Sequence, residues 1–288
     1  MSKTIGLAPL RDFCKYVLYT GFVANAPRPV SGLIVAEAER GKSTESQKWE
    51  GIGVITLQDL TSFGIARVVS EMSEKDRKIV HHIVVPDLEK IGSRNREVRD
   101  ELLSMFRVIM DEGLKKTCTG RQKIDLEEPV RLGVLMCTTP EDLGDRRSVF
   151  RTLSFQSRIL PFTYDFSDDL KAKIMDFVDT EDHIVKQKFF FNREEKTKVT
   201  LPPKYAKKLN IYALLLAKRL EAFSRKSPSD MRKENRLVGI RAKENLMTLL
   251  KAIALYHGRT IVKREDFEEF RRLYRYMNYK SINIDEVE

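Results

Sequence analysis

The sequence contains few cysteines: the three present, Cys14, Cys118 and Cys137, lie far apart and form no CxxC pair. This scarcity argues against a disulfide framework and against a zinc site, and it favours a reducing, cytoplasmic setting. Long apolar runs are also missing, since none approaches the ~20 residues that cross a bilayer. The first dozen residues are charged and lack a long apolar core, so we expect neither a signal peptide nor a membrane partner.

The composition is that of a folded, basic protein. Hydrophobic residues make up 42% of the 288 positions, which excludes a disordered tail. The net charge is +10 and the isoelectric point is about 9.4. An excess of this size favours a polyanionic partner, with nucleic acid ahead of a membrane surface. The alternative is a lysine-rich surface that is only solvated.

Short apolar segments alternate with amphipathic ones through the first half of the chain. This alternation predicts an α/β fold with a doubly wound parallel sheet. From residue 168 onward the pattern becomes mostly helical, so we expect a core domain at 1–167 and a helical domain at 168–288. The expected strands span 32–36, 53–57, 78–85, 130–139 and 159–166, and the expected helices span 8–26, 60–72 and 95–113.

A phosphate-binding loop is predicted directly after the first strand. The P-loop pattern G-x-x-x-x-G-K-[ST] is matched except that Ala36 replaces the first glycine. Glycine lets the backbone approach a phosphate, lysine places a cation on the β- and γ-phosphates, and serine offers a hydroxyl to Mg²⁺. We expect Glu37 and Glu39 to point outward; the alternative is a solvated Gly-Lys turn. The predicted binding residues are Ala36, Arg40, Gly41, Lys42, Ser43 and Thr44.

An acidic residue follows the third predicted strand. Asp87 lies 45 residues after Lys42, a separation typical of the acid that orients Mg²⁺ together with Ser43. Ligands in open parallel sheets bind at the carboxyl ends of strands, where this acid is expected. Glu89 is the candidate base for the attacking water, displaced by one position from the usual place. The alternative is that Glu89 caps the following turn.

With these motifs in place, the order of elements resembles the AAA+ family of P-loop ATPases, nearest to the MCM and MoxR-like branches. The resemblance implies a residue on the next strand that senses the γ-phosphate, and both Thr138 and Thr139 are candidates. It also implies an arginine that reaches into a neighbouring subunit's site. The stretch 154–162 is similar to the "SRF" segment of those branches, which makes Arg158 the first choice, with Arg151 and Arg147 behind it. The alternative is a locally paired surface arginine.

The helical half is similar to an AAA+ lid. Residues 238–246 resemble the start of the lid helix that carries a second sensor, which would bring Arg241 to the γ-phosphate. Residues 258–267 resemble the lid ending "GR..V..eD" of the same branches. The family resemblance therefore implies an ATPase that uses ATP and Mg²⁺ and works as a homo-oligomeric ring or spiral with shared sites.

What such an ATPase acts on is less defined. The basic charge favours a motor or loader for nucleic acid, DNA above all, and residues 113–129 fit a hairpin or loop insertion with phosphate-contact candidates Lys115, Lys116, Arg121 and Lys123. A solvated loop is the alternative. A MoxR-like protein-remodelling ATPase and a nucleotide-dependent switch with weak hydrolysis also stay open. The chain is short for a complete helicase, so we expect an additional protein partner. The row Phe189–Phe191 fits a packed strand or helix face better than a stacking platform.

Overall fold

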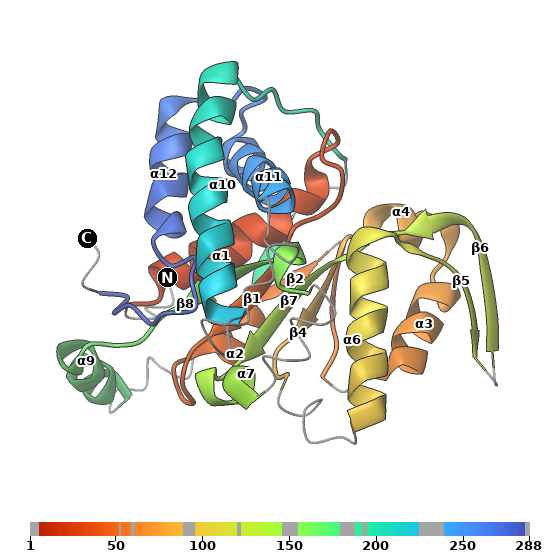
Figure 1. Ribbon diagram of the computed structural model, residues 1–288, viewed down its shortest axis with the longest axis horizontal. Coiled ribbons are helices and arrows are strands. Elements are labelled where there is room, and N and C mark those ends of the chain that lie inside the picture. Colours follow the sequence, from red (N-terminus) through yellow and green to blue (C-terminus); the bar gives the residue numbers. More distant parts are fainter. Residues whose placement is uncertain are drawn as a thin grey trace.

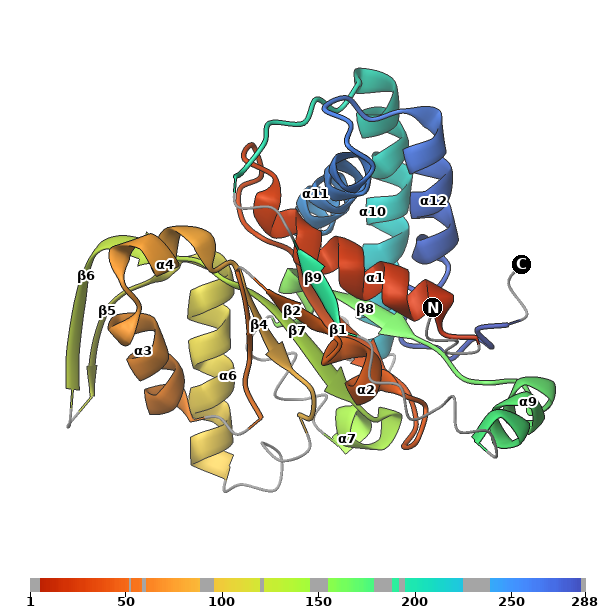
Figure 2. The same cartoon turned by 180° about the vertical axis from the view of Figure 1, so that it is seen from behind.

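The computed structural model describes residues 6–51, 53–58, 61–88, 96–119, 122–145, 155–178, 188–191, 195–224 and 239–285. It is an α/β protein with a five-stranded parallel sheet in the order β3-β4-β7-β1-β8 (Figures 1 and 2). The strands of this sheet are β1 (Ser31–Val35), β3 (Val54–Thr56), β4 (His82–Val85), β7 (Gly133–Thr138) and β8 (Ile159–Thr163).

The central strand β1 is buried on both faces and pairs in parallel on both sides. Every residue of β1 is buried, as expected when helices cover both faces of a strand. It pairs in parallel with β7 on one side and β8 on the other, with Val35 opposite both Thr138 and Thr163. The carboxyl ends of these strands therefore form one edge of the sheet.

Helices cover both faces of the sheet. One face packs against α3 (Ser62–Glu71) and α6 (Arg96–Asp111), and the other against α1 (Ala8–Tyr19). The shorter helices are η1 (Thr20–Phe22), α2 (Lys42–Ser46), α4 (Glu74–Ile79), α7 (Pro140–Asp145) and η2 (Gln156–Arg158).

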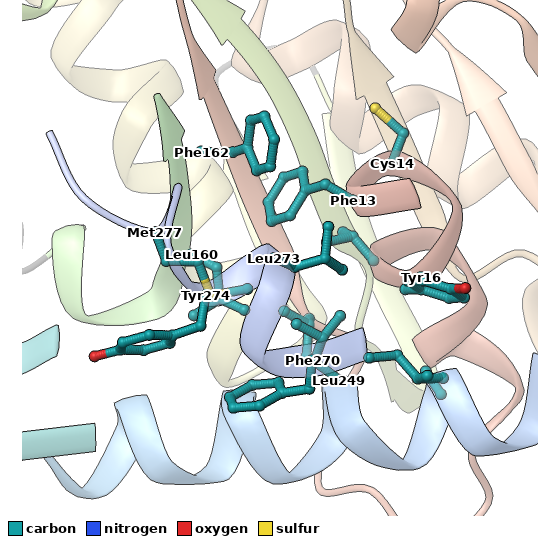
Figure 3. Packing of buried hydrophobic residues seen from close by; sticks show 14 of the residues in the cluster. Phe13, Cys14, Tyr16, Leu160, Phe162, Leu249, Phe270, Leu273, Tyr274 and Met277 are labelled. Carbon is teal, nitrogen blue, oxygen red and sulfur yellow. The ribbon is translucent and has the colours of Figure 1, made fainter. Parts of the chain in front are cut away.

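The described residues after position 167 are mostly helical. The helices there are α9 (Asp168–Val178), α10 (Pro203–Ser224), α11 (Ile240–Tyr256) and α12 (Arg264–Tyr274), of which α11 and α12 pack on α1. Phe13 of α1 meets Phe162 of β8 with ring centroids 4.7 Å apart, and Phe270 of α12 belongs to the same cluster (Figure 3). Full burial of each such side chain contributes about 1.5–3 kcal/mol. Residues on both sides of position 167 thus share one core.

Two small sheets complete the fold. The strands β5 (Leu114–Thr119) and β6 (Gln122–Val130) form an antiparallel hairpin between α6 and β7, which confirms the predicted insertion. The strands β2 (Trp49–Gly51) and β9 (Phe189–Phe191) pair in parallel. Trp49 stacks on Phe189 and Phe191, so the phenylalanine row is a packed strand.

Several predicted boundaries were wrong. The third strand begins at His82 instead of Lys78, because α4 continues to Ile79. Ser73 explains that helix, since its hydroxyl accepts a hydrogen bond from the Asp76 amide and caps the first turn. The first helix ends at Tyr19, and a 3₁₀ turn follows it. Within the described residues, no helix is long and apolar enough to cross a bilayer.

Candidate functional site: the carboxyl edge of the sheet

The predicted phosphate loop leaves β1 and turns back at Gly41. Gly41 has a left-handed backbone with φ of 76°, and a Cβ at this position would lie 2.9 Å from Leu7 Cδ1. The left-handed backbone favours glycine here, and a Cβ would in addition require Leu7 to shift. Lys42 is buried, and its Nζ donates a hydrogen bond to the Glu37 carbonyl at 3.1 Å. The ammonium is thus folded into the loop instead of extending into solvent.

The loop also contains a strained residue. Glu39 has a φ of 62°, and among the described residues no other non-glycine residue has a positive φ. Such a conformation costs on the order of 1–2 kcal/mol and persists where the surroundings require it, often at functional sites. Glu37 and Glu39 are both exposed, as expected, so their charges face away from the loop interior. Ala36 is buried in the core, and its backbone φ is not positive.

Ser43 joins the loop to the end of β4. Its hydroxyl donates a hydrogen bond to the Pro86 carbonyl at 2.7 Å, which places it one residue from Asp87. The loop after β1 and the acid after β4 therefore meet, although β7 separates the two strands. This contact brings Ser43 to the segment that carries Asp87, while the joint role predicted for the two residues stays a prediction.

Cys137, near the end of β7, lies beneath this meeting point. Its Sγ is 3.6 Å from the Lys42 carbonyl and 3.5 Å from Ser46 Oγ. Burial raises the pKa of the Cys137 thiol to about 12, while the Lys42 charge lowers that pKa and the Asp87 charge raises it further. Both charged groups are thus near one buried atom of β7.

The two threonines after Cys137 have different environments. Thr139 Oγ1 accepts a hydrogen bond from the Asp142 amide at 3.3 Å, so this hydroxyl caps α7. Thr138 is buried, and its Oγ1 has no hydrogen-bond partner. Unpaired buried hydroxyls are uncommon because each costs about 1–3 kcal/mol. Of the two sensor candidates, Thr138 is the one with an unused polar group.

The helix that follows the loop is anchored by a carboxylate that the sequence patterns did not single out. Glu45 is fully buried and pairs with Lys48 Nζ at 2.5 Å and with Arg11 Nε at 3.4 Å. The pair with Arg11 ties α2 to α1, and the pair with Lys48 is local. Since α2 has only five residues, its dipole adds little, and the lysine side chain and loop amides would supply most of the attraction for an anion. Thr44 is exposed.

Arg40 points away from the loop interior. Its Nε donates to Asp165 at 2.9 Å, and its main-chain carbonyl accepts a hydrogen bond from the Tyr164 hydroxyl at 2.6 Å. Both partners follow β8, so Arg40 fixes the loop to the neighbouring strand. Arg40 therefore holds the loop in place, and its guanidinium is bound to the Asp165 carboxylate.

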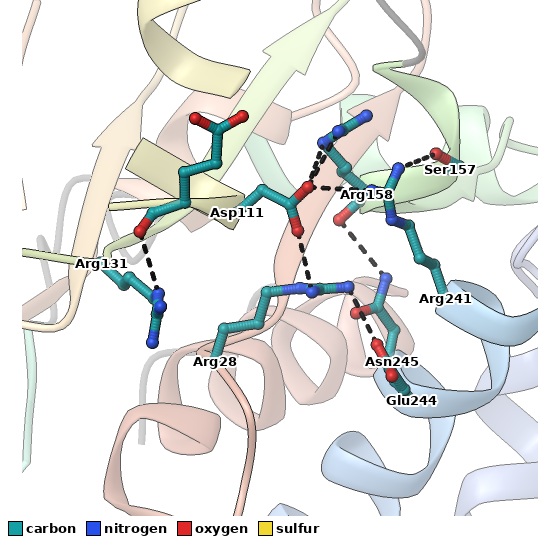
Figure 4. Close-up of polar contacts among 9 residues, drawn as sticks. Arg28, Asp111, Arg131, Ser157, Arg158, Arg241, Glu244 and Asn245 are labelled. Carbon is teal, nitrogen blue, oxygen red and sulfur yellow. Dashed lines mark hydrogen bonds and ion pairs between the residues drawn. The ribbon is translucent and has the colours of Figure 1, made fainter. Parts of the chain in front are cut away.

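The structure places the other two arginine candidates at the opposite edge of the sheet. Arg158 directly precedes β8, and its Nη2 lies 2.8 Å from Asp111 Oδ2 at the end of α6 (Figure 4). Arg241, at the start of α11, binds the same oxygen at 3.0 Å. Arg28 binds the other Asp111 oxygen at 2.9 Å. Since β8 alone spans about 16 Å, Arg241 does not reach the loop of its own chain in this arrangement.

Charge explains why one carboxylate can hold three arginines. Burial alone would raise the pKa of Asp111, but the charges of Arg158, Arg241 and Arg28 outweigh it and hold that pKa below its usual value. Asp111 was not singled out in the sequence because it is simply the last residue of an amphipathic helix. We name Arg28, Asp111, Arg158 and Arg241 the amino-edge cluster.

The hairpin candidates belong to β5 and β6, which form an arm that projects beyond α3 and α6 (Figure 1). Lys115 and Lys116 are exposed, and Lys116 pairs with Asp125 across the strands at 3.2 Å. Glu127 and Glu128 are exposed on the same hairpin. The described charges of the arm are therefore mixed rather than purely basic.

Some predicted residues lie outside the described part of the chain. They are Glu89, Arg121, Arg147 and Arg151, and the side chain of Lys123 is likewise not described.

The site offers Mg²⁺ two protein oxygen donors. Ser43 Oγ and the Asp87 carboxylate are hard oxygen donors, and the hydrogen bond from Ser43 to the Pro86 carbonyl brings Ser43 next to the segment that carries Asp87. Mg²⁺ in nucleotide sites is held by one or two protein groups, with phosphates and waters completing an octahedron. In the part of the chain that the structure describes, no group of three His, Cys, Asp or Glu side chains could hold a metal by itself. The residues fit a metal that arrives with a phosphate ligand.

Comparison with known proteins adds no assignment: no protein-family model matches the chain, and no curated protein sequence is significantly similar to it.

Proposed function

We propose that this protein is a P-loop ATPase of the AAA+ type that moves, loads or remodels nucleic-acid complexes as an oligomer. The observation that carries the proposal is the convergence at the carboxyl edge, where the Ser43 hydroxyl binds the Pro86 carbonyl beside Asp87. The motif residues come from segments that are distant in the sequence, and a chance Gly-Lys-Ser turn would not require an acid and an unpaired threonine at the same edge.

Each residue has a role that follows from its chemistry. A phosphate oxygen would replace the Glu37 carbonyl as the partner of the Lys42 ammonium, with little movement of the side chain. Ser43 and Asp87 would hold Mg²⁺, which when bound neutralises charge on the phosphates. The unpaired Thr138 hydroxyl would hydrogen-bond the γ-phosphate or the attacking water. Glu89 stays the candidate base.

The position of the arginines bears on assembly. Neither Arg158 nor Arg241 lies at the loop of its own chain, since Asp111 holds both at the amino edge. A complete site would therefore need an arginine from a neighbouring subunit, which fits a ring or spiral. For Arg158 to serve that purpose, it would have to leave Asp111. Hydrolysis by isolated chains should accordingly be slow, and turnover per chain should rise with protein concentration.

The same observation favours one second candidate, a nucleotide-dependent switch with weak hydrolysis. Arg158 is 8% exposed and paired with a carboxylate, so it is not presented to a partner as it stands. A switch of this kind would bind nucleotide with the same loop and change its partners on binding. Turnover that stays slow at high protein concentration and with DNA, despite tight ATP binding, would favour the switch over the motor.

The nucleotide site is tested by Lys42→Ala, with Lys78→Ala as the control. Both remove one lysine charge, but Lys78 pairs with Glu74 at the surface, where solvent screens the interaction. We expect Lys42→Ala to weaken ATP binding at least tenfold, about 1.4 kcal/mol, and to abolish turnover, while Lys78→Ala behaves as wild type. Asp87→Asn should keep binding within a few-fold and lose turnover. Equal ATP binding by wild type and Lys42→Ala would refute the assignment.

The nucleic-acid role is tested on the hairpin. Double-stranded and single-stranded DNA of increasing length should stimulate ATP turnover, with a stimulation that falls as salt rises. Lys115→Glu should reduce the stimulation severalfold and lower the salt dependence, whereas Lys78→Glu should not. Stimulation by unfolded protein and not by DNA would support the MoxR-like alternative instead.

A further inference from the structure

The long helix α10 carries an apolar stripe that faces solvent. Ile211, Leu214 and Leu215 are 65%, 54% and 43% exposed. They lie three and four residues apart, so they occupy one side of the helix. The opposite side is buried against α11 and α12 through residues such as Leu209 and Leu216. The exposure of these three side chains means that no described element covers the stripe.

The stripe continues to a hollow between α10 and α11. The hollow has a volume of about 140 Å³ and is lined by Ser157, Ala217, Leu220, Gly239, Ile240, Arg241 and Ala242. Leu214 lies one turn before Ala217, and Ile240, at the rim, is 64% exposed. A cavity of roughly 150 Å³ accepts a benzene-sized group, so this hollow can hold one leucine or phenylalanine side chain.

Positive charge surrounds the stripe. Lys204, Lys207 and Lys208 precede it and Lys218 follows it, all exposed. Among the exposed positions that the structure describes on α10, none is acidic. Arg241 adds a partly exposed guanidinium beside the hollow. We name Ile211, Leu214, Leu215, Ile240 and the flanking lysines the α10 face.

We infer that the α10 face binds an acidic amphipathic helix of a partner protein, with one large apolar side chain seated in the hollow. An amphipathic helix places apolar residues at i, i+3, i+4 and i+7, which matches a stripe and an adjoining pocket. Acidic residues on its flanks would pair with Lys207, Lys208 and Lys218. The three exposed aliphatic side chains distinguish this face from a nucleic-acid surface, which uses its cations on phosphates and has no use for an apolar stripe.

The chain itself is a poorer occupant. The connection at 225–238 contains five basic and two acidic residues, so its charge has the same sign as that of the α10 face. A second copy of this chain is also net basic, at +10. Charge complementarity therefore selects a partner of opposite sign. The inference does not depend on nucleotide binding.

The test uses a displayed library of amphipathic helices selected on the full chain. Flanking positions vary between Glu and Lys, and anchor positions vary among Leu, Phe and Ala. We expect Glu to be enriched over Lys and Leu or Phe over Ala. A selected peptide should bind Leu214→Glu at least tenfold more weakly than wild type, and Lys207→Glu with Lys218→Glu severalfold more weakly. The control is Met175→Glu on α9, which alters an equally exposed apolar residue, 69% exposed, elsewhere.

Three outcomes would overturn the inference. One is enrichment of Lys or of no sequence class. Another is a selected peptide that binds Leu214→Glu as well as wild type, because it must then bind elsewhere. The third is Leu214-dependent binding to vesicles of phosphatidylglycerol and phosphatidylcholine without any selected peptide, which would make the α10 face a lipid-binding surface. Circular dichroism of each variant separates lost binding from lost folding.

Discussion

Replacing Asp111 with asparagine should destabilise the protein markedly, because one carboxylate compensates three arginines. Arg28 and Arg158 bind it with side chains that are 12% and 8% exposed, and the carboxylate itself is 15% exposed. The asparagine side chain would keep the size and one acceptor oxygen but lose the charge. Three guanidinium groups would then remain close together, with Glu244 as the nearest described acid, 3.3 Å from Arg28.

The expected magnitude comes from the burial of the cluster. Removing one partner of a buried ion pair costs about 3–5 kcal/mol, since the other charge remains without compensation. Asparagine keeps a hydrogen-bond acceptor and Glu244 is 42% exposed to solvent, so we expect the lower end, about 3 kcal/mol. In domains of 150–250 residues, a loss of 1 kcal/mol in stability lowers Tm by roughly 2–4 °C. We therefore expect the Tm of Asp111→Asn to fall by about 6–12 °C.

Urea unfolding at neutral pH measures this change as a shift in midpoint at constant slope. The control is Asp168→Asn, which removes a carboxylate that is 95% exposed and paired with Lys171, and it should change stability by less than about 0.5 kcal/mol. Adding Arg241→Gln to Asp111→Asn should recover about 1 kcal/mol, because one of the uncompensated charges is removed. If Asp111→Asn matches its control, Asp111 does not compensate these arginines.

Three further changes test other parts of the fold. Burial lowers the pKa of His82 from 6.5 to about 4, so the unfolded chain binds a proton more readily than the folded protein does. The free energy of unfolding should therefore be constant above pH 6.5 and fall by about 3 kcal/mol as the pH drops to 4. Urea titrations of His82→Gln should show a weaker dependence of this free energy on pH, and an unchanged dependence would contradict the assignment. Thr138→Val removes an unpaired buried hydroxyl, so calorimetry should show that the free energy of unfolding rises by about 1 kcal/mol, while ATP turnover falls. A lower free energy of unfolding would mean that the hydroxyl forms a hydrogen bond. Gly133→Ala would put a Cβ 2.4 Å from His82 Nε2, and urea unfolding should show a loss of about 3 kcal/mol in stability. Gly258 has open space around it, so Gly258→Ala should cost only about 1 kcal/mol, because of its φ of 72°. Equal losses for the two variants would contradict the steric explanation.

The sequence was sufficient for the parallel core because its strands are nearly pure apolar runs. Residues 32–36 could be predicted as a buried strand from five consecutive apolar or small residues, and β1 occupies 31–35. The segment 78–85 misled because Lys78, Ile79 and Val80 are also compatible with a strand. Only the Ser73 cap, five residues earlier, marks the start of the helix that includes Ile79.

The carboxyl edge was more predictable than the amino-edge cluster for a physical reason. A P-loop has particular residue types at a fixed spacing, so Lys42 and Ser43 could be proposed as phosphate ligands from local sequence alone. The amino-edge cluster is built from contacts such as Arg158 to Asp111, which are 47 residues apart, and Arg241 to Asp111, 130 apart. No local pattern marks an arginine that binds a distant carboxylate. The prediction that Arg241 faces the loop relied on a family likeness, and it lacked this pairing information.

The contrast between the two edges bears on where the protein works. At the amino edge three cations share a carboxylate, and removing it should be costly. At the carboxyl edge Glu39 keeps a left-handed backbone and Thr138 keeps an unpaired hydroxyl, both of which cost stability. Folding alone would favour replacing Glu39 by glycine and Thr138 by valine. Groups that cost stability in the free protein are expected where a ligand uses them. The local energetics therefore support the proposal that a ligand binds at the loop after β1 and not at the amino-edge cluster.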